Sequence, residues 1–290
     1  MTSILTNISA MSALQTLRSI NSDMKDTQSS VSSGLRVGQA SDNVAYWSIS
    51  TTMKSDNKAL GAATDALGVG AAKVDTAYAA MDSAIDVVNE IKAKLTTASE
   101  SSVDKKQVQL EIDKLQEQLT AIGQAASFNG ENWMVNDTKA TVVDGFIRKE
   151  DGTVKVNTAE FQAGSYAMFS TIASGVGSGG ILGAIMTIEL TSVTTQGQID
   201  TFLNTVQTAL DNLTDGAAAL GALKTRIDMQ DDFSSKLSDA IKSGVSRLVD
   251  ADMEEESARL SALQTQQQLA VQSLSIANSG SQQLLSLFRG

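Results

Sequence analysis

The 290-residue sequence contains no proline, no cysteine and no histidine. At the usual frequency of roughly 5%, a chain of this length would carry about fourteen prolines. Because proline removes a backbone donor and clashes with the preceding helical turn, its absence favours long uninterrupted helices. Without cysteine and histidine the chain has no disulfide, thiolate nucleophile, imidazole base or zinc site of the usual kind. Most enzyme templates are therefore excluded. Together with the patterns below, this leads us to predict a non-enzyme with no catalytic residue, cofactor or metal.

Charge is scarce at both ends of the chain. The 22 basic and 33 acidic residues give a net charge of −11, which argues against nucleic acid or an anionic membrane as partner. Residues 1–50 are neutral and residues 257–290 carry only two arginines, so 51–256 holds the remaining 17 basic and 30 acidic residues. No apolar run approaches the ~20 residues of a membrane span. The start also lacks the basic region of a secretory signal.

A seven-residue apolar repeat predicts a coiled-coil seam between residues 60 and 95. Its main row is Leu60, Leu67, Val74, Met81, Val88 and Leu95, with Ala71, Tyr78 and Ile85 interleaved. After a polar break at 99–102, a second helical run alternates spacings of four and three: Val108, Ile112, Leu115, Leu119 and Ile122. So short a break predicts that the two helices are antiparallel neighbours.

The composition changes after Asn129-Gly130. Ten of the 21 glycines and seven of the 12 aromatic residues lie in 128–202, which predicts strands and loops there. Asp151-Gly152 stands between alternating residues and predicts a β-hairpin closed by a two-residue turn. The glycine-rich stretch 174–180 is predicted to be a flexible loop, without the lysine that a phosphate-binding loop needs. We expect a compact outer domain whose aromatic residues form its own core, with contacts to neighbouring subunits as the alternative: Phe146, Phe161, Tyr166 and Phe169.

The apolar repeat resumes near residue 199 and predicts a helix of roughly 75 Å. Its positions are Ile199, Val206, Leu213, Leu220, Ile227, Ser234, Ile241 and Leu248. Around Glu254-Glu255-Glu256 the phase shifts, as in a coiled-coil stutter. A new stripe follows: Leu260, Leu263, Gln267, Ala270, Leu274, Ala277, Ser281, Leu284 and Phe288. The N-terminal end mirrors it with Ile4, Ile8, Met11, Leu14 and Leu17.

These patterns predict a mainly α fold, an antiparallel coiled-coil rod formed by the N- and C-terminal segments. The expected parts are an N-terminal helix (1–45), rod helices (46–135), a small α/β or hairpin-containing insert at the far tip (136–198), a rod helix (199–252) and a C-terminal helix (253–290). The terminal helices are too weakly apolar to hold a compact core alone. Helices of that kind order when partners surround them, which points to a subunit that polymerises.

Short motifs at both ends resemble those of bacterial flagellins. They are SSGLRV at 32–37 and SDNVA at 41–45, then ADMEEES at 251–257, LSIAN at 274–278 and LLSLFR at 284–289. The resemblance covers roughly 1–135 and 200–290. Tyr46-Trp47-Ser48 is similar to the short flagellins of rhizobia and related bacteria.

The resemblance implies a structural subunit that is exported and polymerises into the flagellar filament outside the cell. Implied partners are copies of itself, possibly with sister flagellins, an export chaperone, a cap protein and hook–filament junction proteins. We assign the polymerisation interface, as an expectation, to residues at both ends of the chain. They are Ile4, Ile8, Met11, Leu14, Leu17, Arg36, Asp42, Leu274, Leu284 and Phe288. For Arg36 and Asp42, two alternatives stay equally open: a role in pairing between subunits or in fixing a turn, and ordinary solvated charge.

Three other interpretations are weighed against this one. A hook–filament junction protein would share the terminal pattern but match the C-terminal motifs less well. A flagellin-like surface adhesin would need a ligand groove in the insert, where we see no polar and aromatic cluster. An intracellular coiled-coil scaffold would carry denser Glu and Lys at the positions flanking its seam.

Overall fold

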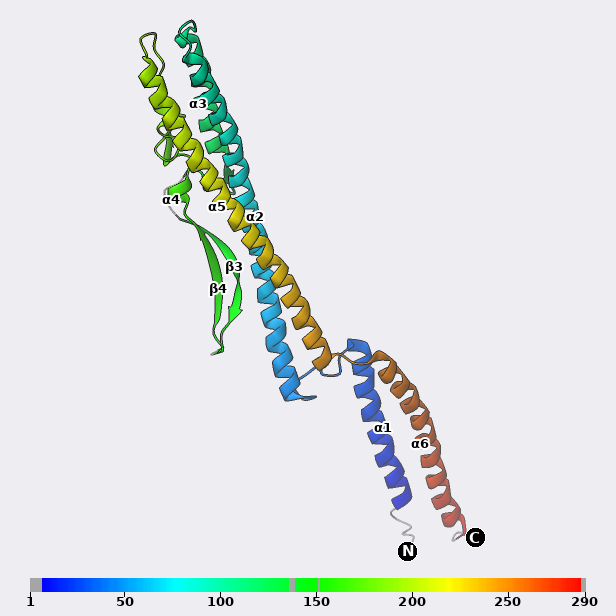
Figure 1. Ribbon diagram of the computed structural model, residues 1–290. Helices are drawn as coiled ribbons and strands as arrows, with labels where there is room; N and C mark the ends of the chain where they lie inside the picture. The colour runs from blue at the N-terminus through cyan, green and yellow to red at the C-terminus, as the bar shows by residue number, and fades with distance from the viewer. Residues whose placement is uncertain (1–6, 136–138, 151, 288–290) are drawn as a thin grey trace. The chain divides into compact units, whose positions relative to one another are not determined.

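The structure is a computed structural model that describes residues 7–135, 139–150 and 152–287, with side chains up to residue 279. The chain forms two compact units, one of Met1–Asn57 with Asp239–Gly290 and the other of Lys58–Ser238. Long helices dominate both, and small strands lie in the middle of the chain (Figure 1). The predicted mainly α fold with a small strand-containing middle region is confirmed.

The seam of the 58–238 unit is built by α2 (Val44–Ala98) and α5 (Gln196–Val249). Every residue of the predicted main row, from Leu60 to Leu95, is at most 3% exposed. The predicted interleaved row is shifted by one position from the buried one, because Tyr78 is 43% exposed. The buried second row consists of Ala63, Gly70, Ala77, Ala84, Ile91 and Ala98. Five of these six are Ala or Gly, which let neighbouring backbones approach closely.

On α5 the predicted row is buried from Ile199 to Ser234. Ile241 and Leu248 are only partly buried, and Val245 and Val249 are the buried residues in that last part. The hydroxyl of Ser234 is buried with no hydrogen-bond partner. A small polar residue thus occupies an apolar seam position near the end of the 58–238 unit.

The helical run after the polar break is α3 (Lys105–Ala125), which returns beside α2 as predicted (Figure 1). Asp104 caps its first turn by accepting from the Lys106 N–H at 3.0 Å. Lys94 of α2 pairs with Glu111 of α3 at 2.6 Å, as antiparallel neighbours can. The predicted α3 residues are buried or partly buried against the core: Val108, Ile112, Leu115, Leu119 and Ile122.

Polar side chains of α3 hold the segment that leads into α5, a contact that apolar periodicity does not predict. The buried Gln116 donates from Nε2 to the carbonyl oxygens of Ile185 (2.8 Å) and Ile188 (3.2 Å). Lys105 Nζ donates to the Thr194 carbonyl at 2.6 Å. These bonds add side-chain partners to backbone carbonyl groups of an irregular segment. The segment includes η1 (Ile185–Thr187).

The middle region contains three two-stranded antiparallel sheets in the described residues. They are β1 (Ser127–Phe128) with β2 (Glu131–Asn132), β3 (Ala140–Arg148) with β4 (Val154–Phe161), and β5 (Thr171–Ala173) with β6 (Val176–Ser178). A short helix, α4 (Ala163–Tyr166), follows β4.

Two turns differ from the prediction. The hairpin around Asp151-Gly152 exists, but the Gly152 N–H bonds to the Lys149 carbonyl at 3.0 Å, so Gly152 is the fourth residue of the turn, with φ +81°. Such a longer loop suits a left-handed glycine at its end. Asp151 itself lies outside the described residues. The predicted flexible loop is instead the β5–β6 hairpin, in which Ser174 (φ +53°) and Gly175 (φ +80°) form a two-residue turn.

The described residues of the insert, 139–150 and 152–198, form no separate core, contrary to the prediction. The insert's buried residues belong to one hydrophobic core with α2, α3 and α5. Phe161 stacks between Trp133 and Tyr166 with ring centroids 5.8 Å apart on each side. Phe169 is fully buried next to Gly123 of α3. The predicted far-tip outer domain is therefore wrong in this respect, because the insert packs along the helices.

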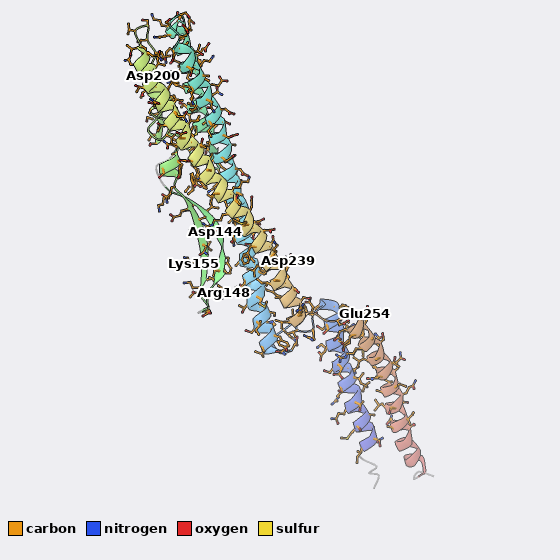
Figure 2. All side chains as sticks on the ribbon, viewed as in Figure 1. Asp144, Arg148, Lys155, Asp200, Asp239 and Glu254 are labelled. Atoms are coloured by element: carbon orange, nitrogen blue, oxygen red, sulfur yellow. The ribbon has the colours of Figure 1, made fainter. Side chains whose placement is uncertain are left out.

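The β3–β4 hairpin lies alongside the middle of α2 and α5 (Figures 1 and 2). Asp144, labelled in Figure 2, forms an ion pair with Arg226 of α5. The pairing of β3 with β4 shifts register between Val143 and Gly145, so Asp144 occupies a bulge. Val142 of β3 is 4% exposed and packs against Gly70 of α2.

Gly70→Ala is expected to destabilise the 58–238 unit by about 1–3 kcal/mol, as overpacking of a core does. An added Cβ at position 70 would lie 2.0 Å from Val142 Cγ1. Gly68→Ala is the matched control, because nothing lies within 4 Å of its added Cβ. Alanine in a helix interior stabilises by roughly 0.5–1 kcal/mol relative to glycine. Urea unfolding of both variants measures the difference, and equal midpoints would contradict the close contact.

Candidate functional site

Helices α1 (Ile8–Ser33) and α6 (Met253–Leu287) pair antiparallel within the unit that contains both ends of the chain. Asn7 Nδ2 donates to the Ala277 carbonyl at 2.8 Å. Gln267 Nε2 donates to Asn21 Oδ1, also at 2.8 Å. Residues far apart in the sequence are thus brought side by side, as the symmetric sequence pattern predicts.

Each of the two helices has its own cap. Asn7 Oδ1 accepts from the Ala10 N–H at 3.0 Å, and α1 ends at Gly34 with φ +72°. Asp252 Oδ1 accepts from the N–H groups of Glu254 (3.0 Å) and Glu255 (3.3 Å). Helix α6 therefore begins anew after α5 ends at Val249, and the predicted stutter is wrong. An aspartate cap with three glutamates in the first turn suits the positive end of a helix dipole.

The predicted stripe on α6 is confirmed as far as side chains are described. Between residues 261 and 279, only positions 263, 267, 270, 274 and 277 are buried or partly buried. Leu274 is one of them, so it faces the α1 side of the pair. The side chains of Ser281 and Leu284 and all of Phe288 lie outside the described residues.

The corresponding stripe on α1 differs from the prediction. Ile8, Met11 and Leu14 are 71%, 64% and 38% exposed, while Leu17 is partly buried. The residues that are buried or partly buried along the helix are Ala10, Ala13, Leu17, Ile20, Met24, Thr27, Ser30 and Val31. The seam therefore mixes small and large residues, and Ile8, Met11 and Leu14 remain exposed outside it. Ile4 lies outside the described residues.

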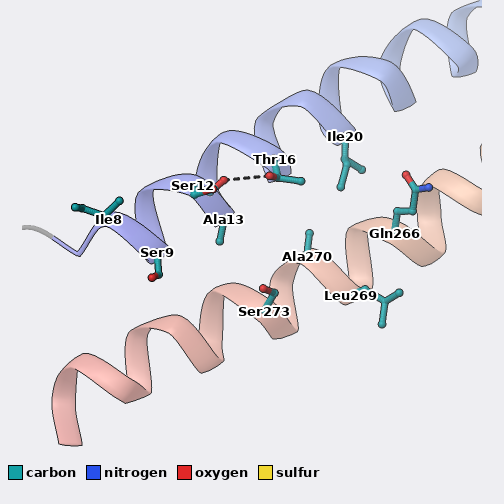
Figure 3. Close-up of a pocket in the computed structure, with 10 residues that line it drawn as sticks. All are labelled: Ile8, Ser9, Ser12, Ala13, Thr16, Ile20, Gln266, Leu269, Ala270 and Ser273. Atoms are coloured by element: carbon teal, nitrogen blue, oxygen red, sulfur yellow. Dashed lines mark hydrogen bonds between the residues drawn. The ribbon is translucent and has the colours of Figure 1, made fainter. Parts of the chain in front are cut away.

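An open groove of about 760 Å³ lies between α1 and α6 (Figure 3). Ala13 and Ala270 face one another between the two helices (Figure 3). The exposed Ile8 and Leu269 also line it, with Ile20 and Gln266. Its hydroxyl groups come from Ser9, Ser12, Thr16 and Ser273. On α6, Leu269, Val271 and Ile276 are 59%, 52% and 72% exposed, so both helices carry uncovered apolar surface.

A small junction connects the loop after α1 to the end of α5. The Arg36 N–H donates to the Val249 carbonyl at 2.7 Å, and the Ala251 N–H donates to the Gly34 carbonyl at 3.0 Å. Val37 is buried with Val245 and Val249 in a separate apolar cluster. The Arg36 guanidinium donates to the Leu248 carbonyl at 3.2 Å, near the negative end of the α5 dipole. Arg36 thus contacts the chain's own backbone.

Asp42 closes the turn before α2. Its Oδ2 accepts from the N–H groups of Gly38 (2.9 Å) and Gln39 (3.0 Å). The hydrogen bond from the Gln39 N–H, with that from Gly38, lowers the pKa of Asp42 below its ordinary value of 3.8. The geometry therefore favours the turn-fixing role over pairing between subunits.

The turn at 38–42 is expected to loosen in acid. Because the folded-state pKa of Asp42 is lowered, its contribution is present above pH 3.8 and is lost as the pH falls through the lowered pKa. Hydrogen exchange of the Gly38 and Gln39 amides, corrected for intrinsic rate, measures this. Asp42→Ala should lose the protection at every pH, whereas Asp42→Asn keeps an acceptor and should lose only the pH dependence. Unchanged protection in Asp42→Ala would contradict the assignment.

A third exposed apolar surface lies at the start of α2. Val44, Tyr46, Trp47 and Ile49 are 70%, 42%, 38% and 50% exposed. Asn43 Oδ1 caps this helix by accepting from the Tyr46 N–H at 3.1 Å. Ser50 is buried, and Met53 packs against the Val37 cluster. Tyr46 and Met53 precede Leu60 at the same seven-residue spacing, so they extend the predicted main row toward the start of α2.

The described residues contain no group of three or more acidic side chains that would suit a metal ion. No helix among them is long and apolar enough to cross a membrane. The unit that holds both ends of the chain leaves apolar surfaces uncovered on α1, on α6 and at the start of α2.

Comparisons with known proteins bear on both ends of the chain. The profile of the bacterial flagellin N-terminal helical region matches residues 4–139, and that of the bacterial flagellin C-terminal helical region matches 203–288. The chain is 46% identical to flagellin C of Rhizobium meliloti (strain 1021) over the full length of both proteins. This chain belongs to the bacterial flagellin family. It is also 45% identical to flagellin A of the same strain and 46% identical to a flagellin of Brucella melitensis biotype 1, again over both full lengths.

A solved flagellin structure from Bacillus cereus is also similar, with 14% identity and a TM-score of 0.44 over 57% of this chain and 86% of that one. As a rhizobial-type flagellin, the protein is a structural subunit of the flagellar filament and polymerises with copies of itself. The alternatives of a junction protein and an adhesin are not favoured. Two of the motifs that carry the flagellin resemblance, at 32–37 and 251–257, contribute residues to the junction described above.

Proposed function

We propose that flagellin subunits join through the apolar surface that α1 and α6 leave uncovered. The observation that carries this proposal is the exposure of Ile8, Met11 and Leu14 on a helix whose seam with α6 is already filled by other residues. Burial of such surface stabilises by roughly 25 cal/mol per Å². Because few charged groups lie on these helices, little desolvation opposes that gain.

The proposed interface residues divide into three roles. Leu17 and Leu274 hold α1 and α6 together, so they act by shaping the surface. Ile8, Met11 and Leu14 contact the neighbouring subunit directly, together with Leu269, Val271 and Ile276. Arg36 and Asp42 act within the chain by fixing the junction and its turn. Ile4, Leu284 and Phe288 are proposed for the same interface from the sequence alone.

The contact between subunits is proposed to be heterologous. A surface on one copy that meets a different surface on the next does not close on itself, and so generates an open helical filament. The groove lined by Ile8 and Leu269 is one such surface, and the exposed residues at the start of α2 are another. Two unlike apolar surfaces in one chain satisfy this requirement.

The wider partners follow from the family rather than from contacts. We propose that the chain is exported to the outside of the cell through the flagellum. An export chaperone, a cap protein and the hook–filament junction proteins would bind it on the way or at the filament ends. We propose no enzymatic activity.

Seeded growth of the purified full-length protein tests the function. Electron microscopy is expected to show long filaments that extend from short filament fragments of the same protein. Sedimentation should show a critical concentration below which the protein stays soluble. Persistent soluble monomers at high concentration, in the presence of seeds, would contradict self-polymerisation.

A further inference from the structure

Methionine is the sulfur-containing residue of this chain, because the sequence has ten methionines and no cysteine. Three methionines, Met81, Met134 and Met168, are fully buried. Three others are well exposed: Met11 at 64%, Met229 at 62% and Met253 at 43%. Exposure of the thioether determines its access to oxidants, so these three are the most accessible sites of sulfur oxidation among residues 7–135, 139–150 and 152–279.

Met11 differs from the other two by its place in the first turns of α1. It lies between Ile8 and Leu14, the other two exposed apolar residues of that helix. The α1–α6 seam passes through Ala10, Ala13 and Leu17 instead. A chemical change at the Met11 thioether therefore leaves the pairing of α1 with α6 in place and alters only the outward surface.

We propose that Met11 is an oxidation-sensitive site that controls whether a subunit can join the filament. The inference rests on the proposed function, because it requires this side of α1 to be covered by another copy. The reagent is a two-electron oxidant of the peroxide class. The thioether sulfur attacks one oxygen of hydrogen peroxide, and the S–O bond forms as the O–O bond breaks. The proton of the attacked oxygen passes to the departing hydroxide, which leaves as water. Sulfur is oxidised by two electrons and the peroxide is reduced by two.

The product is a sulfoxide, which converts an apolar side chain into a polar one. In the free subunit its oxygen is hydrated, so folding is unaffected. In the contact between two subunits, called the joint below, the sulfoxide oxygen loses its hydrating water. Burying a polar group without a hydrogen bond is unfavourable. We expect the critical concentration to rise about tenfold, the change that corresponds to a modest loss of binding free energy. Once a subunit has been incorporated, the covered thioether is shielded from the same oxidant.

The test treats full-length monomer with hydrogen peroxide and follows each methionine by peptide mass spectrometry. Met11 sulfoxide should appear, circular dichroism of the monomer should not change, and the critical concentration should rise about tenfold. Met11→Leu should assemble equally well before and after treatment. Met229→Leu, a control of matched exposure, should remain sensitive. Normal assembly of protein carrying Met11 sulfoxide, equal sensitivity of Met11→Leu, or loss of monomer helicity on oxidation would overturn the inference.

Two further measurements separate this inference from the proposed function. Met11→Gln places a polar side chain in the joint without oxidation, so it should raise the critical concentration by itself. If it assembles normally, Met11 is not in the joint and both proposals fail there. If it is impaired while the sulfoxide is harmless, only the redox inference fails. In preformed filaments Met11 should oxidise at least several-fold more slowly than in monomer, and an equal rate would contradict its burial.

Discussion

Replacement of both Ile8 and Leu269 by aspartate is expected to abolish filament formation and leave the monomer folded. The two residues are 71% and 59% exposed and line the same groove, so neither supports the core of the free chain. Substitutions at exposed positions of this kind change the free energy of unfolding by about 0.5 kcal/mol or less. In a filament every subunit would bury two unpaired carboxylates, which costs several kcal/mol for each charge. Sedimentation and electron microscopy measure assembly, and thermal unfolding measures the fold.

The matched control keeps the same positions apolar. Ile8→Val with Leu269→Met preserves most of the buried apolar surface, so filaments should form with little change in critical concentration. The pair of variants then separates loss of apolar character from a general intolerance to substitution. Filaments of normal length from the double aspartate variant would show that this groove is not part of the joint.

The main helical seam could be predicted from the sequence because large apolar residues repeat every seven positions. From Leu60 to Leu95 each predicted residue is buried. The second row was misplaced because its members are mostly small, and the apolar pattern gave Tyr78 preference over Ala77. Ala77 is 2% exposed and Tyr78 is 43% exposed. The position of the second row depends on how closely the backbones of two helices approach. That distance cannot be predicted from the sequence of one helix alone.

For the hairpins, too, one part could be predicted from the sequence and another could not. Alternating residues around Asp151-Gly152 correctly predicted β3 and β4, but loop length could not be read from the dipeptide alone. The two-residue turn was found instead at Ser174-Gly175, within a stretch whose composition suggested flexibility. Gly177 explains part of this order, because an added Cβ there would lie 2.4 Å from the ring of the fully buried Phe169. Glycine in that stretch serves close packing.

The candidate site was predictable on α6 and only partly on α1. Helix α6 carries leucine at its seam, so periodicity finds it. On α1 the seam uses Ala10, Ala13, Leu17, Ile20, Met24 and Thr27, while Ile8, Met11 and Leu14 are exposed. Helix α1 therefore carries apolar residues on more than one side. The periodicity of the sequence predicts one apolar stripe but does not indicate which contact that stripe makes.

Deletion of residues 257–290 is expected to eliminate filaments and to unfold α1 as well, while the 58–238 unit stays folded. Most of α6 and its seam residues, from Leu260 to Ala277, are removed. Helix α1 then has 26 residues and little apolar surface to bury, and isolated helices of that kind are marginal in water. No α6 residue up to 279, the last whose side chain is described, belongs to the core of the 58–238 unit, so the thermal midpoint of that unit should be unchanged.

Hydrogen exchange and circular dichroism separate these effects. Amides of α1 should lose protection, and helical signal should fall by more than the deleted residues alone explain. Ile20→Asp is the full-length control, because Ile20 is 9% exposed in the α1 seam and a carboxylate there should unpair α1 from α6. It should reproduce the loss of α1 protection and of assembly without any deletion. If α1 stays protected in the truncated protein, or if either variant still forms filaments, pairing of α1 with α6 is not what prepares the subunit surface for assembly.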